Sequence, residues 1–372
     1  MNKGLKFFAP AAAAIVGLMA SCGSSVVASS SIETTSTTST TTSETTSVAP
    51  EMATIKAAHG YYAPYAIKAA TARAPQLVQT DVDYVGVLLE DDGTILDLKI
   101  DVMQVKATGV DATTTTINGT VFPDTTDFKT KWDLLEDYNM NGEAGEWYEQ
   151  ALKIEQYAVG KNIETLISEL NGTTTFGADV SITVDGFAEA LVVASEENNY
   201  REFEVEASDV ENLKLGIGMS SSHEAKRTNI NIASVVFNGE EVLDAQIDVL
   251  QVPYTITAVG DPVVYEVGID TTKAQVSGED GIIMSKVTIQ DLYGMGAISE
   301  VGEFYEQADS FELYVIGKTL DVAFAASALE TGTHGLAFID GATIGVTIGV
   351  SDLIAVTEEA ELISAGRVLP TV

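Results

Sequence analysis

The chain has 372 residues and carries 55 acidic against 19 basic side chains, which gives a formal net charge of -36 at pH 7. A surface this negative repels nucleic acids and anionic lipid headgroups, so both are excluded as partners of the folded part. One cysteine and three histidines exclude a disulfide framework and leave few ligands for a His/Cys metal centre.

Residues 1–22 have the pattern of a lipoprotein signal peptide. Lys3 and Lys6 precede an apolar run from Phe7 to Met19 that is too short to span a membrane, and small residues lead to Cys22. The pattern resembles a bacterial lipobox, which implies cleavage before Cys22 and a lipid on its thiol. We therefore expect a lipid anchor that holds the protein at the extracellular face of the cell membrane. The alternative is a spare cysteine in an ordinary secretory signal.

Residues 23–74 are predicted to be a disordered tether. From Gly23 to Ser47 nearly every residue is serine or threonine. Such a segment cannot bury enough apolar surface to offset the entropy lost on ordering.

Two segments of the chain recur roughly 150 residues later. The sequence GEWYEQA at 145–151 returns as GEFYEQA at 302–308, and IDVMQV at 100–105 returns as IDVLQV at 247–252. The interval is the size of a domain rather than of a solenoid repeat. We predict two copies of one module, residues 75–205 and 206–372.

Each predicted module begins with a β-hairpin. In the first, strands 84–89 and 95–105 flank Asp-Asp-Gly, and in the second, strands 230–237 and 242–252 flank Asn-Gly. Asp-Gly and Asn-Gly are the dipeptides most typical of tight hairpin turns.

Helices are predicted after each hairpin. Apolar residues lie three and four positions apart over 146–158, and Gly160 and Gly317 end this helix in the two copies. The further predicted elements are a helix at 163–170, a strand at 180–184 and a helix at 186–196, with a strand at 343–350 and a helix from 351 in the second copy. The fold class is α+β: two tandem repeats, each a small antiparallel or mixed sheet packed with helices on one side.

These motifs resemble a known family. The order of hairpin, Asp-x-x-Gln, Gly-Glu-aromatic-Tyr-Glu-Gln-Ala and Tyr-x-x-Gly-Lys is similar to that in FMN-binding modules of lipoproteins in flavin-based extracellular electron transfer. Those modules are distantly similar to the FMN-binding subunit of sodium-pumping quinone reductase. The resemblance implies an FMN cofactor, an FMN transferase that attaches it, and a membrane quinone or NADH dehydrogenase as electron donor.

The resemblance also implies an attachment residue, the last threonine of a Ser-Gly-Ala-Thr-like motif. Thr347, preceded by Gly345, occupies this position in the second module, and Ser181 occupies it in the first. Candidate contacts to the flavin ring are Trp147 and Phe304, with Tyr148 and Tyr305 beside them and Met140 and Met295 upstream; all of these also suit core packing. Gln104 and Gln251 end the repeated strand and are candidates to bond flavin or phosphate, or simply to end the strand.

Two functions remain open from the sequence. The first is a lipid-anchored electron carrier that passes electrons from a membrane dehydrogenase to extracellular acceptors. The second is a flavin-free ligand-binding or structural lipoprotein built on the same module. No nucleophile–base constellation, zinc-protease motif or phosphate-binding glycine loop indicates a substrate-converting enzyme.

Overall fold

The computed structural model describes residues 49–121, 128–140, 142–171, 180–277, 281–332, 335–338, 345–346 and 348–367. Apart from Ala49, these residues belong to one compact unit, Pro50–Val372. Cys22, the Ser/Thr-rich segment and Thr347 lie outside the described residues. Within the described ranges, no helix combines the length and apolar character needed to cross a membrane.

The first sheet is antiparallel and has the strand order β6-β5-β4-β3-β1-β7, with β2 paired to β3. Its strands are β1 Met52–Tyr62, β2 Tyr65–Lys68, β3 Leu77–Glu90, β4 Ile95–Gly109, β5 Thr115–Ile117, β6 Thr120–Val121 and β7 Arg201–Glu206. The hairpin of β3 and β4 turns at Gly93, whose φ of 84° lies in the left-handed region that glycine adopts without strain.

The second sheet has the order β11-β10-β9-β8 and is also antiparallel. Its strands are β8 Leu213–Glu224, β9 Arg227–Asn238, β10 Glu241–Val259 and β11 Val264–Ile269. Two short ribbons complete the described strands, β12 Val276–Ser277 with β13 Ile282–Ile283 and β14 Leu329–Gly332 with β15 Gly335–Phe338.

The helices fall into one group after each hairpin. The first group is α1 Lys131–Leu134, η1 Leu135–Tyr138, α2 Trp147–Ala158, α3 Ile163–Leu170, α4 Asp185–Ala194 and η2 Glu197–Asn199. The second is α5 Lys286–Ile289, η4 Gln290–Tyr293, η5 Met295–Ala297, α6 Phe304–Val315, α7 Leu320–Ala323, η6 Ala326–Ala328 and α9 Ser351–Ser364. The 3-10 segment η3 Ala207–Asn212 connects β7 to β8. We call residues 52–206 the first half and residues 213–367 the second half.

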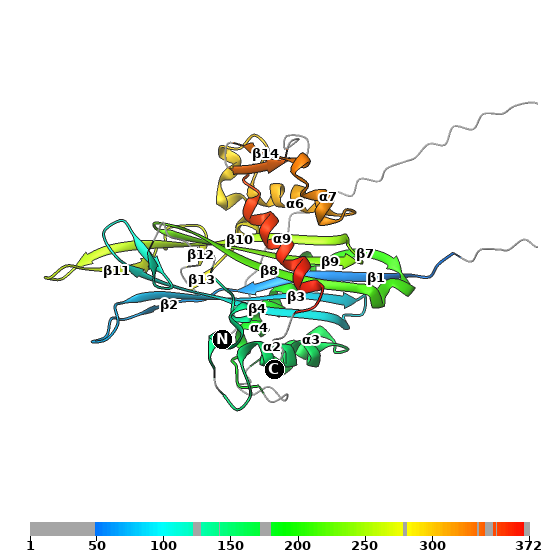
Figure 1. Ribbon diagram of the computed structural model, residues 1–372, viewed down its shortest axis with the longest axis horizontal. Helices are drawn as coiled ribbons and strands as arrows, with labels where there is room; N and C mark the ends of the chain where they lie inside the picture. The colour runs from blue at the N-terminus through cyan, green and yellow to red at the C-terminus, as the bar shows by residue number, and fades with distance from the viewer. Residues whose placement is uncertain are drawn as a thin grey trace, which may run out of the picture. The chain divides into compact units, whose positions relative to one another are not determined.

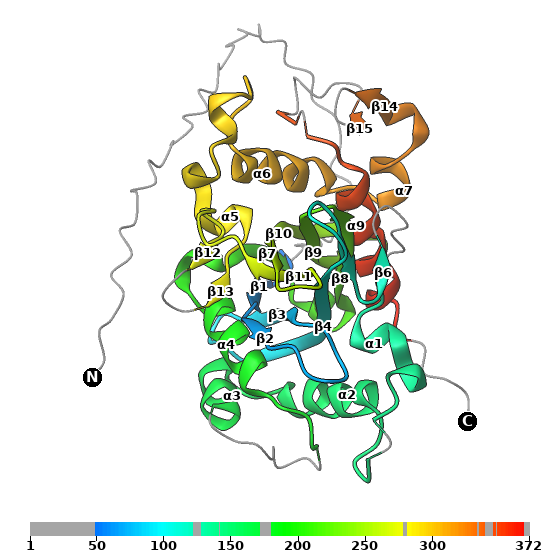
Figure 2. The ribbon, with the colours of Figure 1, turned by 90° about the vertical axis from the view of Figure 1, so that its left-hand side faces the viewer.

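The two sheets pack face to face, with one group of helices on each outer side (Figure 1). α2, α3 and α4 cover the first sheet, while α6 and α9 cover the second, as the turned view also shows (Figure 2). The core between the sheets includes Tyr84, Met103, Ile232 and Leu250, all buried. The resulting order of layers is helices, sheet, sheet, helices.

Glycines let one helix of each half lie directly on a strand. A Cβ at Gly60 of β1 would stand 2.0 Å from the Ala190 carbonyl oxygen of α4. A Cβ at Gly216 or Gly218 of β8 would stand 1.8 Å or 2.0 Å from a carbonyl oxygen of α9. No Cβ fits at these distances, so glycine is what permits the close approach.

The α+β class, both hairpins and the helix 163–170 are confirmed, and the helices predicted over 146–158 and 186–196 appear with slightly shifted ends. The predicted tether is wrong from residue 52 onward, because β1 and β2 lie within 23–74. The strand at 180–184 is also wrong, since the Ser181 and Ile182 N–H groups bond a side chain instead of a neighbouring strand. The described residues of 343–350 form no strand, and the others lie outside the described ranges.

Candidate functional site

A pocket of about 480 Å³ lies between the first sheet and its helices. Four aromatic side chains, Tyr62, Tyr138, Trp147 and Phe187, line it together with Met140 and Ser181. Trp147 is 3% exposed and packs edge-on against Trp132, with ring centroids 6.5 Å apart. The pocket therefore combines aromatic walls with several polar and charged groups, and its size suits a small molecule.

The pocket is also acidic. Asp81 and Asp83 of β3 and Asp185 of α4 line it, and Lys131 is the lining residue of opposite charge. Burial raises the pKa of Asp83 to about 7, with Asp81 adding to the rise and Lys131 opposing it. A cationic ligand in the pocket would lower the pKa of Asp83, because a nearby positive charge stabilises the ionised form of a carboxyl group.

The buried side chain of Gln150 fixes the segment that carries Ser181. Its Nε2 donates to the Gly145 carbonyl at 2.8 Å, and its Oε1 accepts from Ser181 N at 2.6 Å and Ile182 N at 3.2 Å. Nε2 also approaches Met140 Sδ at 3.9 Å. One side chain of α2 thus connects Met140 and Ser181, which both line the pocket. The Ser181 side chain itself remains exposed to solvent.

A second buried side chain, Asp101 of β4, holds the start of α1 and with it Lys131. Asp101 Oδ1 accepts from Val102 N at 2.7 Å and from Trp132 N at 3.2 Å. Burial raises the pKa of Asp101 to about 7 although Arg367 lowers it. Thr130 caps the same helix by accepting from Asp133 N.

The second half contains most of the same contacts. Gln307 donates to the Gly302 carbonyl at 3.2 Å and to Met295 Sδ at 3.6 Å, and accepts from Ile348 N at 3.2 Å. Asp248 Oδ1 accepts from Val249 N at 2.6 Å and Val287 N at 3.1 Å. The bond from Gln307 places Ile348 beside α6, as the bonds from Gln150 place Ser181 and Ile182 beside α2.

The charges around the first-half pocket differ from those in the corresponding region of the second half. β9 has Asn229 opposite Gln251 and Asn231 opposite Val249, where β3 has Asp81 opposite Gln104 and Asp83 opposite Val102. The Lys286 ammonium lies 4.7 Å from the Phe304 ring centroid and 5.0 Å from that of Tyr293. Burial lowers its pKa to about 8, with Arg227 lowering it further and Asp248, Glu224 and Asp352 raising it. The second half thus has two fewer carboxylates on its strand and a desolvated ammonium beside its aromatic rings.

The predicted site residues are only partly brought together. Ser181, Trp147 and Met140 line the first-half pocket, whereas Gln104 does not, and its backbone carbonyl accepts from Asn118. Phe304 is buried beneath Lys286, and Gly345 has a φ of 72° next to Ser310. Tyr148 and Tyr305 donate to Glu136 and Asp291, respectively.

Gln251 is buried in a network of amides. Its Nε2 donates to Asn229 at 2.9 Å, and its Oε1 accepts from Gln275 at 3.1 Å. Its surroundings therefore differ from those of Gln104, although both end the repeated strand.

Sequence reasoning assigned no role to Gln150, Gln307, Asp101 or Asp248. All four lie in the recurring segments, two in GE[WF]YEQA and two in IDV[ML]QV. The available signal was the recurrence of Gln and Asp at the same positions of both copies, because a buried polar residue is usually present to satisfy other polar groups.

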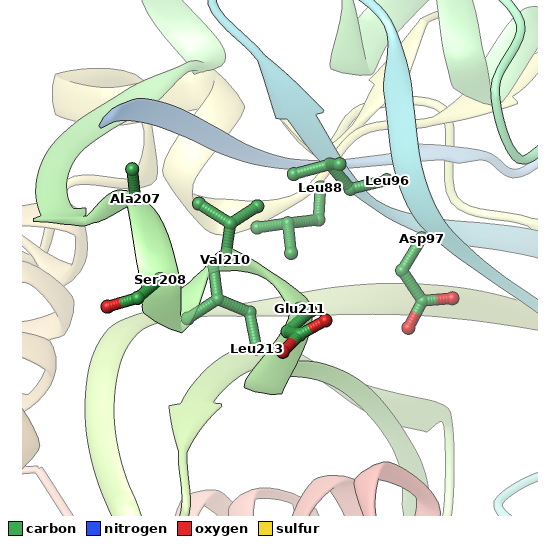
Figure 3. Close-up of a pocket in the computed structure, with 8 residues that line it drawn as sticks. All are labelled: Leu88, Leu96, Asp97, Ala207, Ser208, Val210, Glu211 and Leu213. Carbon is green, nitrogen blue, oxygen red and sulfur yellow. The ribbon is translucent and has the colours of Figure 1, made fainter. Parts of the chain in front are cut away.

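A second pocket, of about 580 Å³, lies at the connection between the halves (Figure 3). Leu88, Leu96, Val210 and Leu213 form its apolar part, and Asp97 and Glu211 stand at its edge. It contains no predicted site residue and no aromatic ring. Across the described ranges, no group of three or more His, Cys, Asp or Glu side chains is arranged to hold a metal ion.

Comparison with known proteins identifies no relative: no family model, no curated protein and no solved structure matches the chain.

Proposed function

We propose that the protein is a lipid-anchored, extracytoplasmic electron carrier of the FMN-binding type. The observation that carries this proposal is that each half holds its predicted attachment segment near its predicted ring contacts: Ser181 lines one pocket with Trp147 and Met140, and Gln307 connects Met295 with Ile348. The family resemblance predicted Ser181, Trp147 and Met140 for three different roles, as attachment point, ring contact and neighbour of the ring. Gln150 joins Met140 and Ser181, and Trp147 and Met140 also pack in the core of the first half.

The second half is the better fit for a flavin phosphate. In the first half, three carboxylates face the pocket and would repel a phosphate monoester. In the second half, Asn229 and Asn231 replace two of these carboxylates, and Lys286 lies over Phe304. We therefore propose one FMN, esterified to Thr347, which follows Val346 in the sequence.

The chain's own contribution would be to bind and orient the cofactor. FMN, when bound, supplies one- and two-electron transfer. Phe304 and Met295 would pack against an apolar ring, Lys286 would pair with the phosphate, and Gln307 would hold the attachment segment. No acid–base residue is required for this role. A quinone or NADH dehydrogenase in the membrane would supply electrons, and an FMN transferase would form the ester.

We further infer that the two halves arose by tandem duplication. The order hairpin, short helix, long helix, last helix occurs twice, and Gln150/Gln307 and Asp101/Asp248 make corresponding hydrogen bonds. The corresponding strands are β1 and β8, β3 and β9, and β4 and β10. The modules would then begin at residues 52 and 213, earlier and later than the predicted starts of 75 and 206.

The test is intact mass and visible absorbance of the full chain co-expressed with an FMN transferase. Wild type, Thr347→Ala and Ser181→Ala are compared, with Thr343→Ala as a nearby hydroxyl control. We expect one added FMN mass, lost only in Thr347→Ala. Absence of added mass and of yellow colour in the wild type would reject the carrier.

The acidity of the first-half pocket favours a second function, binding of a cationic ligand. Asp81, Asp83 and Asp185 stand among four aromatic rings, an arrangement that suits a quaternary or protonated amine. Calorimetric titration of the full chain with tetramethylammonium tests this function. Binding that Asp83→Asn weakens would support it, whereas absence of heat would reject it for this probe.

A further inference from the structure

The first half has a buried glutamate whose counter-ion comes from the far end of the chain. Glu155 of α2 accepts from Ile100 N at 2.9 Å and from Arg367 Nη1 at 2.9 Å. Arg367 also donates to the Ile100 carbonyl, and its guanidinium lies 3.5 Å from the Trp132 ring centroid. The side chains of Arg367 and Glu155 are only 5% and 6% exposed.

The second half has a corresponding glutamate whose counter-ion comes from the first half. Glu312 of α6 accepts from Ile247 N at 2.6 Å and pairs closely with Arg201 Nη2. Arg201 Nη1 donates to the Ala245 carbonyl at 3.1 Å. Glu312 is buried, and Arg201 is the arginine within ion-pair distance.

The two arginines hold the same place in their halves. α4 starts at Asp185 and α9 at Ser351, so the intervals 185 to 201 and 351 to 367 are both 16 residues. Each arginine follows the last helix of one half and contacts the long helix of the other. The chain contains only four arginines, so half of them serve this purpose.

We propose that Arg201 and Arg367 form a reciprocal exchange that locks the halves into one structure, each half supplying the counter-ion for the buried glutamate of the other. A buried carboxylate without a partner is strongly destabilising, so neither glutamate site is complete within its own half. Arg367 is in addition a positioning residue for the first-half pocket. It stacks on Trp132, which packs against the pocket residue Trp147.

Double-mutant cycles in the full chain test which residues are partnered. Arg367→Gln and Arg201→Gln are each combined with Glu155→Gln and with Glu312→Gln, and the unfolding equilibrium is measured by urea titration. Glutamine at either glutamate position keeps the acceptor oxygen for the strand N–H. Arg73→Gln, at an exposed site, is the control.

We expect each single arginine variant to shift the unfolding equilibrium constant on the order of 100-fold toward the unfolded state. Coupling should appear between Arg367 and Glu155 and between Arg201 and Glu312, while the other two combinations should be additive. Coupling of Arg201 with Glu155 or of Arg367 with Glu312 would overturn the exchange, as would additivity throughout.

Tryptophan emission tests the positioning role of Arg367. The chain has two tryptophans, Trp132 and Trp147, so emission reports only on the first half. At a urea concentration where all variants are folded, Arg367→Gln should shift the emission maximum, and Arg201→Gln should leave it unchanged. Equal spectra for Arg367→Gln and wild type would reject the positioning role, whatever the stabilities.

Discussion

Gln150 shows how one side chain can organise a site. It is fully buried, and its two polar atoms hold Gly145 on one side and Ser181 with Ile182 on the other. Gln307 repeats most of this pattern. The segment before each last helix is therefore positioned by a side chain rather than by sheet pairing.

Replacement of Gln150 should therefore cost stability. Gln150→Ala leaves the Ser181 and Ile182 N–H groups and the Gly145 carbonyl without this partner, at about 1–3 kcal/mol for each group that stays buried. We expect a loss of about 3 kcal/mol, measured by urea unfolding. Gln156→Ala, on the exposed face of the same helix, should change stability by less than about 0.5 kcal/mol. Equal effects of the two variants would contradict the assigned role.

At this scale the sequence identified some site residues and could not identify others. Trp147, Met140 and Ser181 were found through the repeat and the resemblance. Asp83 and Lys131 were not, because they lie on β3 and α1 and meet only through the packing of α1 on the sheet. Gln104 and Gln251 have the same position in the motif but different neighbours.

At the scale of elements, the last helix of each half packs directly on a strand that carries glycine at the contact. α9 rests on β8 at Gly216 and Gly218, and α4 rests on β1 at Gly60. The atoms nearest to these glycines belong to the helix backbone, which cannot move aside as a flexible side chain can.

Alanine at Gly218 should therefore push α9 away from β8. Its Cβ would stand 2.0 Å from the Val356 carbonyl oxygen. Overpacking of this kind typically costs about 1–3 kcal/mol, and we expect the upper end because backbone must shift. Thermal unfolding measures the effect, and Gly142→Ala, with nothing within 4 Å of its Cβ, is the matched control. A stability loss no larger than that of the control would show that the helix adapts.

The elements missed by the sequence have physical explanations. β1 reads Met-Ala-Thr-Ile-Lys-Ala-Ala-His-Gly-Tyr-Tyr, which has few large β-branched residues, because small side chains are needed beneath α4. Its apolar alternation is consequently weak. The alternating apolar residues at 180–184 resemble a strand, but Gln150 accepts from the N–H groups of Ser181 and Ile182.

At the scale of the whole molecule, the face-to-face packing of the two sheets was not predicted. Each module was expected to have helices on one side, and this is what each sheet shows. The other face is buried against the second sheet, and the signal for this lay in β9 and β10, whose central residues are buried on both faces. A nearly continuous apolar run indicates such double burial, but it does not say what covers each face.

Stability of the whole molecule should fall as pH rises from about 6.5 to 7.5; above this range Lys286, whose pKa burial lowers to about 8, acts in the opposite sense. Burial raises the pKa of Asp83 and of Asp101 to about 7. In this range the folded state binds more protons than the unfolded state. The contribution of these groups to the free energy of unfolding is therefore fully present only at low pH, and it decreases as they ionise.

The histidines act in the opposite sense at lower pH. Burial lowers the pKa of His59 to about 3 and of His223 to about 4, so below about 6.5 they oppose the carboxyl groups. Urea unfolding at about pH 6.5, 7 and 7.5 checks the prediction for the carboxyl groups. Asp83→Asn should reduce the slope by up to about 1.4 kcal/mol per pH unit, and a stability that rises over this range would contradict it.

The strand that begins the folded unit is joined to its neighbours on both sides, to β3 over residues 55–62 and to β7 over residues 52–57. A force applied through the residues that precede β1 pulls this strand along its own axis. The backbone hydrogen bonds that join β1 to its neighbours lie across that axis. They would have to break together rather than one at a time. The point of attachment is thus mechanically strong, so in a single-molecule pulling experiment from the N-terminus β1 should resist as a unit and give way in one step.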